Sequence, residues 1–302
     1  MSRAFPDFII AGAAKSGTTV LYEHLVTHPS IFIPSIKECR FFSNMPRDFR
    51  GGPAASFMNQ GPRTWGAYQA LFQGQDEMVC GDICNDCFFY YERSIENIKK
   101  YVGTDLPIVI ILRNPVERAY SHYLQAVRMG SESKTFEEAL ALEPARRAKN
   151  YVWSMLYRQT GLSADATESF LSNFRNVQVY LYEEIFTDNG LRHLQEFIGV
   201  SPISFDLARR ANVAQQRVPK SWFLNKSVMS VRHALIKAGV YRSLPKGVNR
   251  LLGAAIRYVN ARNVGRKAEL APETRRALVE YYEPDVRHLE NLLSRDLRHW
   301  RA

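Results

Sequence analysis

The residues best placed to do chemistry near the start of the chain form a small, flexible loop, Gly12-Ala13-Ala14-Lys15-Ser16-Gly17-Thr18-Thr19. The loop follows a short apolar run, 8–11, and precedes apolar residues at helical spacing. A strand, a glycine loop and a helix N-terminus together present backbone N–H groups to an anion, and the helix dipole favours negative charge there. The stretch is therefore predicted to bind a phosphate.

This loop differs from the Walker A motif, which reads G-x-x-x-x-G-K-[ST]. Gly12 and Gly17 have the required separation, but Thr18 occupies the lysine position, and the lysine lies inside the loop as Lys15. Such a loop still accommodates a nucleotide, whereas a magnesium-dependent triphosphate site is disfavoured. A Gly/Ala turn in a parallel-sheet protein is the alternative explanation.

A second stretch offers an arginine and a serine to the same kind of anion. Arg113 follows an unbroken apolar run, 107–112, typical of a central parallel strand whose carboxyl end binds ligands. Ser121 lies about two turns into the helix that Pro115 opens. P-loop ATPases and GTPases usually place a magnesium-holding aspartate at such a strand end. A cation there indicates that side chains, and not a metal, neutralise the anion; a surface arginine and a helix-facing serine are the alternative.

Strands and helices alternate along the chain, and this order predicts how the two stretches are positioned. The predicted strands are 8–11, 78–82, 107–112 and 177–182. The predicted helices are 94–102, 115–129, 151–174 and 191–198. The pattern indicates an α/β fold, a P-loop-type doubly wound parallel sheet flanked by helices, as a single domain over 1–302.

One segment, 207–268, differs sharply in composition. It carries fourteen Lys or Arg residues and no Asp or Glu, while the whole chain has a net charge of +10. Two amphipathic stretches, which begin at Leu224 and Val248, indicate a basic helical insertion or lid within the domain. With the apolar residues Trp222-Phe223-Leu224, they suit an interfacial helix that contacts an anionic membrane. A solvated basic lid is the alternative.

No motif predicts a metal site. The cysteines are Cys39, Cys80, Cys84 and Cys87. Their spacing does not match a zinc site, so buried reduced thiols are expected. His24 and His28 lack the glutamate of H-E-x-x-H between them. No signal peptide and no apolar stretch of about 20 residues is found, so a cytoplasmic location is expected, with membrane association through 207–268.

Taken together, the phosphate-binding stretches resemble those of sulfotransferases that use 3′-phosphoadenosine 5′-phosphosulfate (PAPS). The 12–19 loop looks like their 5′-phosphosulfate loop, and Arg113 to Ser121 looks like their 3′-phosphate motif. The segment Lys37-Glu38-Cys39-Arg40-Phe41-Phe42 is similar to the K-E-x-x-F-F segment of heparan sulfate and related bacterial sulfotransferases. The run 272–300 is similar to the tail of many bacterial members.

This resemblance implies transfer of a sulfuryl group from PAPS to a hydroxyl or amine, with adenosine 3′,5′-bisphosphate as product and no metal required. The donor-binding residues that it implies are Lys15, Ser16, Gly17, Thr18, Thr19, Arg113, Ser121, Arg266 and Lys267. Lys15 and Glu38 are the predicted catalytic residues, because one would stabilise the leaving oxygen and the other would take the acceptor proton. A turn glutamate paired with Lys37 or Arg40 is the alternative for Glu38.

The acceptor is left open between a small molecule, a glycan and a lipid, and no nucleic-acid partner is expected. Many members of this branch carry a Glu-Lys or Glu-Ala pair where this chain has 81–86, so Asp82 or Asp86 is a further candidate on the acceptor side. The oligomeric state is open. Two other functions stay open: a P-loop nucleotide kinase or NTPase, and a non-catalytic basic protein that binds lipid or nucleic acid.

Overall fold

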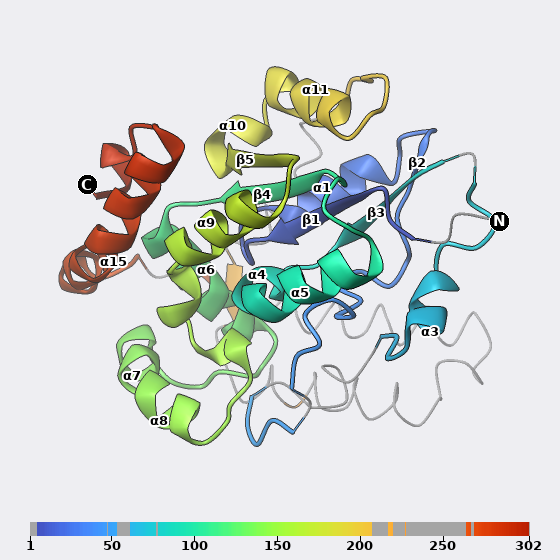
Figure 1. The fold of residues 1–302 in the computed structure, drawn as a ribbon. Helices are drawn as coiled ribbons and strands as arrows, with labels where there is room; N and C mark the ends of the chain where they lie inside the picture. The colour runs from blue at the N-terminus through green and yellow to red at the C-terminus, as the bar shows by residue number, and fades with distance from the viewer. Residues whose placement is uncertain are drawn as a thin grey trace.

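A five-stranded parallel sheet with the order β2-β3-β1-β4-β5 forms the centre of the molecule (Figure 1). The computed structural model describes residues 5–46, 48–52, 61–76, 78–206, 217–219, 227, 264–266 and 269–301. The strands of the sheet are β1 (Phe8–Gly12), β2 (Ile31–Phe32), β3 (Val79–Ile83), β4 (Ile108–Leu112) and β5 (Val177–Leu181). The predicted α/β class and doubly wound parallel sheet are confirmed.

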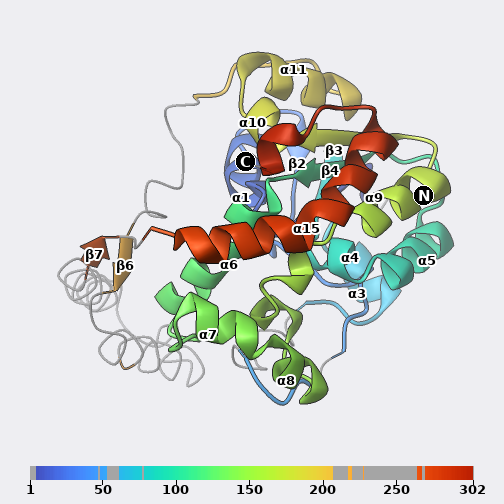
Figure 2. The ribbon, with the colours of Figure 1, turned by 90° about the vertical axis from the view of Figure 1, so that its left-hand side faces the viewer.

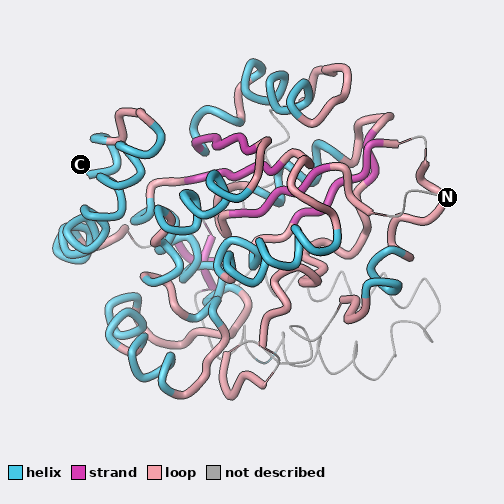
Figure 3. Tube along the Cα trace, in the orientation of Figure 1, coloured by secondary structure: helices cyan, strands magenta, loops and turns pink. Residues whose placement is uncertain are grey.

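Helices cover both faces of this sheet (Figures 1 and 3). The α-helices are α1 (Thr18–Leu25), α3 (Trp65–Gln69), α4 (Asp86–Phe89), α5 (Tyr91–Tyr101), α6 (Pro115–Arg128), α7 (Phe136–Ala141), α8 (Glu143–Ala148), α9 (Ala164–Asn173), α10 (Tyr182–Ile185), α11 (Asp188–Phe197) and α15 (Pro272–Leu293). Short 3-10 turns are η1 (Trp153–Met155), η2 (Gln159–Gly161) and η4 (Arg298–Arg301).

Two hydrophobic layers hold the helices to the sheet, because successive strand residues point to opposite faces. Phe8 and Ile10 of β1 pack in the layer that includes α1 and α11. Ile9 of β1 and Ile108 of β4 belong to the layer that includes α5 and α9. Both strands are buried along their whole length, as their unbroken apolar runs predict.

The long helix α15, near the C-terminus, packs on α6 and α9 (Figure 2). Asp285 accepts hydrogen bonds from the backbone N–H groups of Ser163 and Ala164, both at 3.0 Å, and so caps α9. An antiparallel pair, β6 (Arg217–Pro219) and β7 (Val264–Arg266), joins the two ends of the basic segment, and β6 lies beside α6.

The expectation that 151–174 is mostly helical is wrong. Two 3-10 turns occupy its first half, and α9 begins only at Ala164. The reason lies in Arg118 of α6, whose guanidinium donates to the Tyr157 carbonyl and, at 2.9 Å, to Thr160 Oγ1. A continuous helix would commit the Tyr157 carbonyl to its own backbone ladder.

The cysteines also depart from expectation in part. Cys39 and Cys80 are reduced and buried, as predicted. Cys84 and Cys87 form a disulfide, so the prediction of reduced thiols is wrong for this pair. Because β3 ends at Ile83, the two residues lie across the turn that follows the strand, and their Cα atoms are 5.4 Å apart.

Most of the basic segment 207–268, including Trp222, Phe223 and Lys267, lies outside the described residues. The helical insertion and its membrane contact therefore stay predictions, as does the single-domain assignment. In the part of the chain that the structure describes, no helix combines the length and apolar character needed to cross a bilayer. Within those same ranges, no three His, Cys, Asp or Glu side chains are grouped to hold a metal ion.

Candidate active site

Segments that follow all five parallel strands line one cavity of about 360 Å³. These lining residues include Lys15 after β1, Glu38 after β2, Asn85 after β3, Arg113 after β4 and Tyr182 after β5. The carboxyl edge of a doubly wound sheet is where such folds bind ligands. The structure thus brings the two predicted catalytic residues, Lys15 and Glu38, together with the predicted phosphate ligand Arg113.

The loop at 12–17 is suited to an anion. Gly17 is the N-cap of α1 in a left-handed conformation (φ 86°), and no side chain caps the first helical turn. A Cβ at this position would lie 2.4 Å from the Phe186 ring, so glycine is required. The Ser16 hydroxyl is fully buried and has no hydrogen-bond partner among the described residues. An uncapped helix N-terminus beside an unpaired hydroxyl fits a phosphate or sulfate oxygen.

Lys15 is the cation of this loop, and its charge is sensitive to what the cavity contains. Burial lowers the pKa of Lys15 to about 7, and the positive charges of Arg128 and Arg113 act in the same direction. Arg113 donates from Nη1 to the Lys15 carbonyl at 3.1 Å, and its guanidinium lies over the Tyr182 ring at 4.7 Å. An anion in the cavity would therefore favour the charged form of Lys15.

Glu38 is held by three neighbours. Its Oε1 accepts hydrogen bonds from Lys37 Nζ at 3.0 Å and Asn85 Nδ2 at 2.8 Å, while Arg40 Nη2 lies 3.7 Å from Oε2. Burial opposes the charge on Glu38, but Lys37, Arg40 and the Asn85 hydrogen bond lower its pKa below the ordinary value. The side chain is 27% exposed, so an ionised carboxylate faces the cavity. Lys37 also donates to Thr19 Oγ1 at 3.4 Å, which links this loop to the phosphate loop.

Helix α6 and turn η1 supply further lining residues that the sequence did not reveal. They include His122, Gln125, Ala126, Arg128, Met129, Trp153, Ser154 and Met155. The spacing 122, 125, 126, 129 places four of them on one helical face, a signal that could have indicated them. Burial and the nearby Arg118 charge hold the pKa of His122 well below its ordinary value, so this imidazole is neutral.

Charge distinguishes this cavity from an ordinary apolar pocket. Among its described lining residues, four are Lys or Arg: Lys15, Arg40, Arg113 and Arg128. Glu38 supplies the lining's carboxylate. Such a cavity attracts a polyanionic ligand and offers one base to a second ligand.

A solved sulfotransferase from Alicyclobacillus acidocaldarius matches 99% of this chain and 100% of its own, with a TM-score of 0.75 and 30% sequence identity. The chain belongs to the sulfotransferase family. The family resemblance drawn from the sequence is thereby confirmed, although no family model matches the chain.

This sulfotransferase also matches parts of longer curated relatives. Heparan sulfate glucosamine 3-O-sulfotransferase 3A1 of Mus musculus is 27% identical over 209 residues, which are 68% of this chain and 48% of that protein. Carbohydrate sulfotransferase 15 of Mus musculus is 25% identical over 169 residues, 45% of this chain and 30% of that protein. The chain thus spans about half the length, or less, of these relatives.

The other predicted donor ligands of this sulfotransferase are placed unevenly. Gly17, Thr18 and Thr19 line the cavity beside Lys15. Ser121 is 9% exposed and is not among the lining residues, so its contact with a phosphate stays a prediction. Arg266 lies on β7, paired in register with Arg217.

The two acidic candidates near β3 are buried away from this cavity lining. Asp82 is 2% exposed and accepts a hydrogen bond from the Tyr68 hydroxyl at 2.7 Å. Asp86 is 1% exposed and accepts one from Ser43 Oγ. Among the residues that the structure describes, Glu38 is therefore the acid in direct contact with the cavity.

Proposed function

We propose that this sulfotransferase moves a sulfuryl group from PAPS to a hydroxyl or amine of its acceptor, without a metal ion. The observation that carries the proposal is one cavity that combines three features. These are an anion-binding loop with Lys15, a cation, Arg113, where a magnesium-dependent P-loop enzyme usually needs an acid, and the carboxylate of Glu38.

The side chains divide the work between leaving group and acceptor. Bound PAPS would supply a sulfuryl group activated by its anhydride bond to phosphate. The Lys15 ammonium neutralises negative charge that develops on the leaving oxygen. Glu38 takes the acceptor's proton, a contribution of about 10²–10⁴ in rate. Because Oε1 already accepts two hydrogen bonds, Oε2, with Arg40 at 3.7 Å, is the oxygen that receives the proton.

The two other functions have less support. A nucleotide kinase or NTPase would need the Walker lysine, where this chain has Thr18, and an acid after β4, where it has Arg113. A non-catalytic lipid- or nucleic-acid-binding protein would use the basic segment 207–268 but would leave the cavity unexplained. Family membership favours the enzyme.

For the acceptor, the relatives' names support a glycan hydroxyl first, since they specify heparan sulfate glucosamine and carbohydrate. Small-molecule and lipid hydroxyls are the other classes in the proposal. A cytoplasmic location, with membrane contact through 207–268 and no nucleic-acid partner, is part of the same proposal and rests on the sequence alone.

A panel of acceptors tests the reaction. The protein is incubated with PAPS labelled with ³⁵S and, separately, with desulfated heparin oligosaccharides, 4-nitrophenol and a long-chain alcohol. We expect label in one class of acceptor and an equal amount of adenosine 3′,5′-bisphosphate. Without protein, or with heat-denatured protein, no label should move. Failure to label any class at saturating donor would contradict the proposal.

The pKa of Lys15 predicts how donor binding depends on pH. A bound anion raises the pKa of Lys15 above its value of about 7 in the protein alone, so binding above pH 7 takes up a proton. By linkage, affinity falls by up to about tenfold per pH unit above pH 7. Calorimetry with adenosine 3′,5′-bisphosphate at pH 8.5, in two buffers of different ionisation enthalpy, should report close to one proton taken up. Lys15→Met should report none, and zero uptake by the wild type would contradict the assignment.

A further inference from the structure

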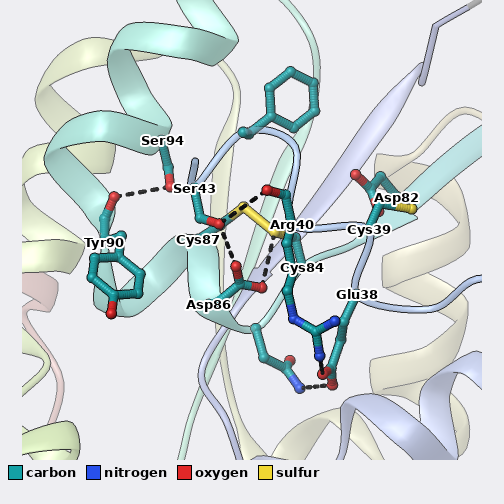
Figure 4. The surroundings of a disulfide bond; sticks show 12 residues. Glu38, Cys39, Arg40, Ser43, Asp82, Cys84, Asp86, Cys87, Tyr90 and Ser94 are labelled. Carbon is teal, nitrogen blue, oxygen red and sulfur yellow. Dashed lines mark hydrogen bonds and ion pairs between the residues drawn. A yellow bond between two sulfur atoms is a disulfide. The ribbon is translucent and has the colours of Figure 1, made fainter. Parts of the chain in front are cut away.

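The Cys84–Cys87 disulfide spans the turn between β3 and α4, and the residues inside it bind the segment that carries Glu38 (Figure 4). Asn85 donates from Nδ2 to Glu38 Oε1 at 2.8 Å. Asp86 accepts a hydrogen bond from Ser43 Oγ. Both residues between the cysteines therefore contact the 37–43 segment.

That segment depends on outside contacts for its shape. Glu38 and Arg40 have φ values of 62° and 59°, in the left-handed region that non-glycine residues rarely adopt. Such conformations persist where surrounding structure fixes them. The strand end and the turn after it supply part of these contacts, since Glu38 N–H donates to the Ile83 carbonyl at 3.0 Å and Asn85 donates to the Glu38 carboxylate. If the turn changes shape, Glu38 keeps Lys37 and Arg40 as neighbours but loses the hydrogen bond from Asn85 that orients Oε1.

The turn is also suited to a second oxidation state. Cys84 Sγ lies 3.5 Å from Asp86 Oδ1, but a disulfide sulfur has no proton to donate. Asp86 is 1% exposed, and burial raises its pKa to about 6. A further hydrogen-bond donor would therefore stabilise the charged form of Asp86. Reduction would give Cys84 a thiol proton that it can donate to Asp86 Oδ1. The same step would remove the covalent link across the turn.

We infer that Cys84 and Cys87 form a thiol–disulfide switch that positions Glu38 through Asn85, with the oxidised form the active one. The inference rests on the proposed function, in which Glu38 is the base. A dithiol reductant acts as a thiolate on one sulfur, the protein S–S bond breaks, and a mixed disulfide forms. The reductant's second thiolate then displaces the cysteine. Two electrons pass to the protein, which gains two thiols while the reductant becomes a disulfide.

Reduction should affect the acceptor side and spare the donor side. Asn85 contacts Glu38, whereas Lys15 and Arg113 lie on segments that follow β1 and β4. Loss of the base position should lower kcat by about 10–100-fold, because displacements of about 1 Å have effects of that order. KM for PAPS and affinity for adenosine 3′,5′-bisphosphate should not change. Both cysteines are fully buried, so the exchange requires local opening of the turn.

The experiment compares oxidised and dithiothreitol-reduced wild-type enzyme, with kcat and both KM values measured on the fastest acceptor of the panel above. Alkylation and mass spectrometry should count two thiols before reduction and four after it. We expect kcat to fall on reduction and to recover on reoxidation. Asn85→Ala should be slow in both states, and Cys84→Ser with Cys87→Ser should match the reduced enzyme. Cys80→Ser, which alters a buried cysteine that forms no disulfide and lies outside the turn, should behave as wild type.

Equal kcat in the two states, with the thiol count changing from two to four, would overturn the switch and leave the proposed function standing. Four thiols before reduction would also overturn it. If neither the oxidised nor the reduced enzyme transfers the sulfuryl group or binds adenosine 3′,5′-bisphosphate, the proposed function itself is rejected. These readouts on wild-type enzyme do not depend on any variant folding.

Discussion

Lys15→Ala should lower the rate of sulfuryl transfer by about 10²–10³-fold or more, the range seen when a donor to a developing negative charge is removed. In this cavity, Lys15 is the loop residue that can place a positive charge beside the leaving oxygen. Arg113 hydrogen-bonds to the backbone carbonyl of Lys15 and not to the Lys15 ammonium. Single-turnover transfer from ³⁵S-labelled PAPS measures the effect directly, since it separates chemistry from product release.

Lys99→Ala is the matched control for this substitution. Lys99 lies on α5, is exposed and donates to Asn173 Oδ1 at 3.0 Å. Its loss should leave the single-turnover rate at the wild-type value. Wild-type turnover in Lys15→Ala would show that the leaving oxygen is neutralised by another group.

Glu38→Gln should lower kcat by about 10²–10⁴-fold, because the amide cannot take the acceptor's proton. Binding of adenosine 3′,5′-bisphosphate should be unchanged, since Glu38 serves the acceptor. The two effects are measured by steady-state transfer and by calorimetry on the same preparation. A Glu38→Gln enzyme with near-wild-type kcat would assign the base elsewhere.

Arg113→Ala provides the opposite pattern. Charge-assisted hydrogen bonds contribute about 1.5–3 kcal/mol, so donor affinity should fall by about 10–100-fold. At saturating donor, kcat should fall far less than in Glu38→Gln. If both variants lose kcat and affinity alike, the division between donor and acceptor sides is wrong.

The sequence predicts the phosphate loop and the strands around it because those features depend on local pattern. The apolar run that ends at Ala11, the glycines at 12 and 17 and the helical spacing after Thr18 all lie within about twenty residues. Arg113 was found for the same reason, since an apolar run places it directly at a strand end. These segments need no distant contact to be recognised.

Features of the site that depend on distant contacts were missed. Asn85 meets Glu38 only because β2 and β3 are neighbours in the sheet, and Trp153 reaches the cavity through a turn that periodicity assigned to a helix. Glu38 itself fits both interpretations offered by the sequence, since it pairs with Lys37 and Arg40 and also lines the cavity. The Cys84–Cys87 pairing was missed although the predicted strand ends within one residue of β3, because the pairing depends on the shape of the turn after the strand, which brings the two Cα atoms to 5.4 Å.

The most direct test of the central claim is thermal unfolding of the protein with adenosine 3′,5′-bisphosphate in the presence of EDTA. A ligand at a hundredfold excess over its Kd stabilises the native state by about 2.7 kcal/mol, so Tm should rise clearly without any magnesium. ADP and ATP, which lack the 3′-phosphate, should raise Tm much less under the same conditions. A larger rise with ATP that requires magnesium would contradict the account and point to a nucleotide kinase or NTPase.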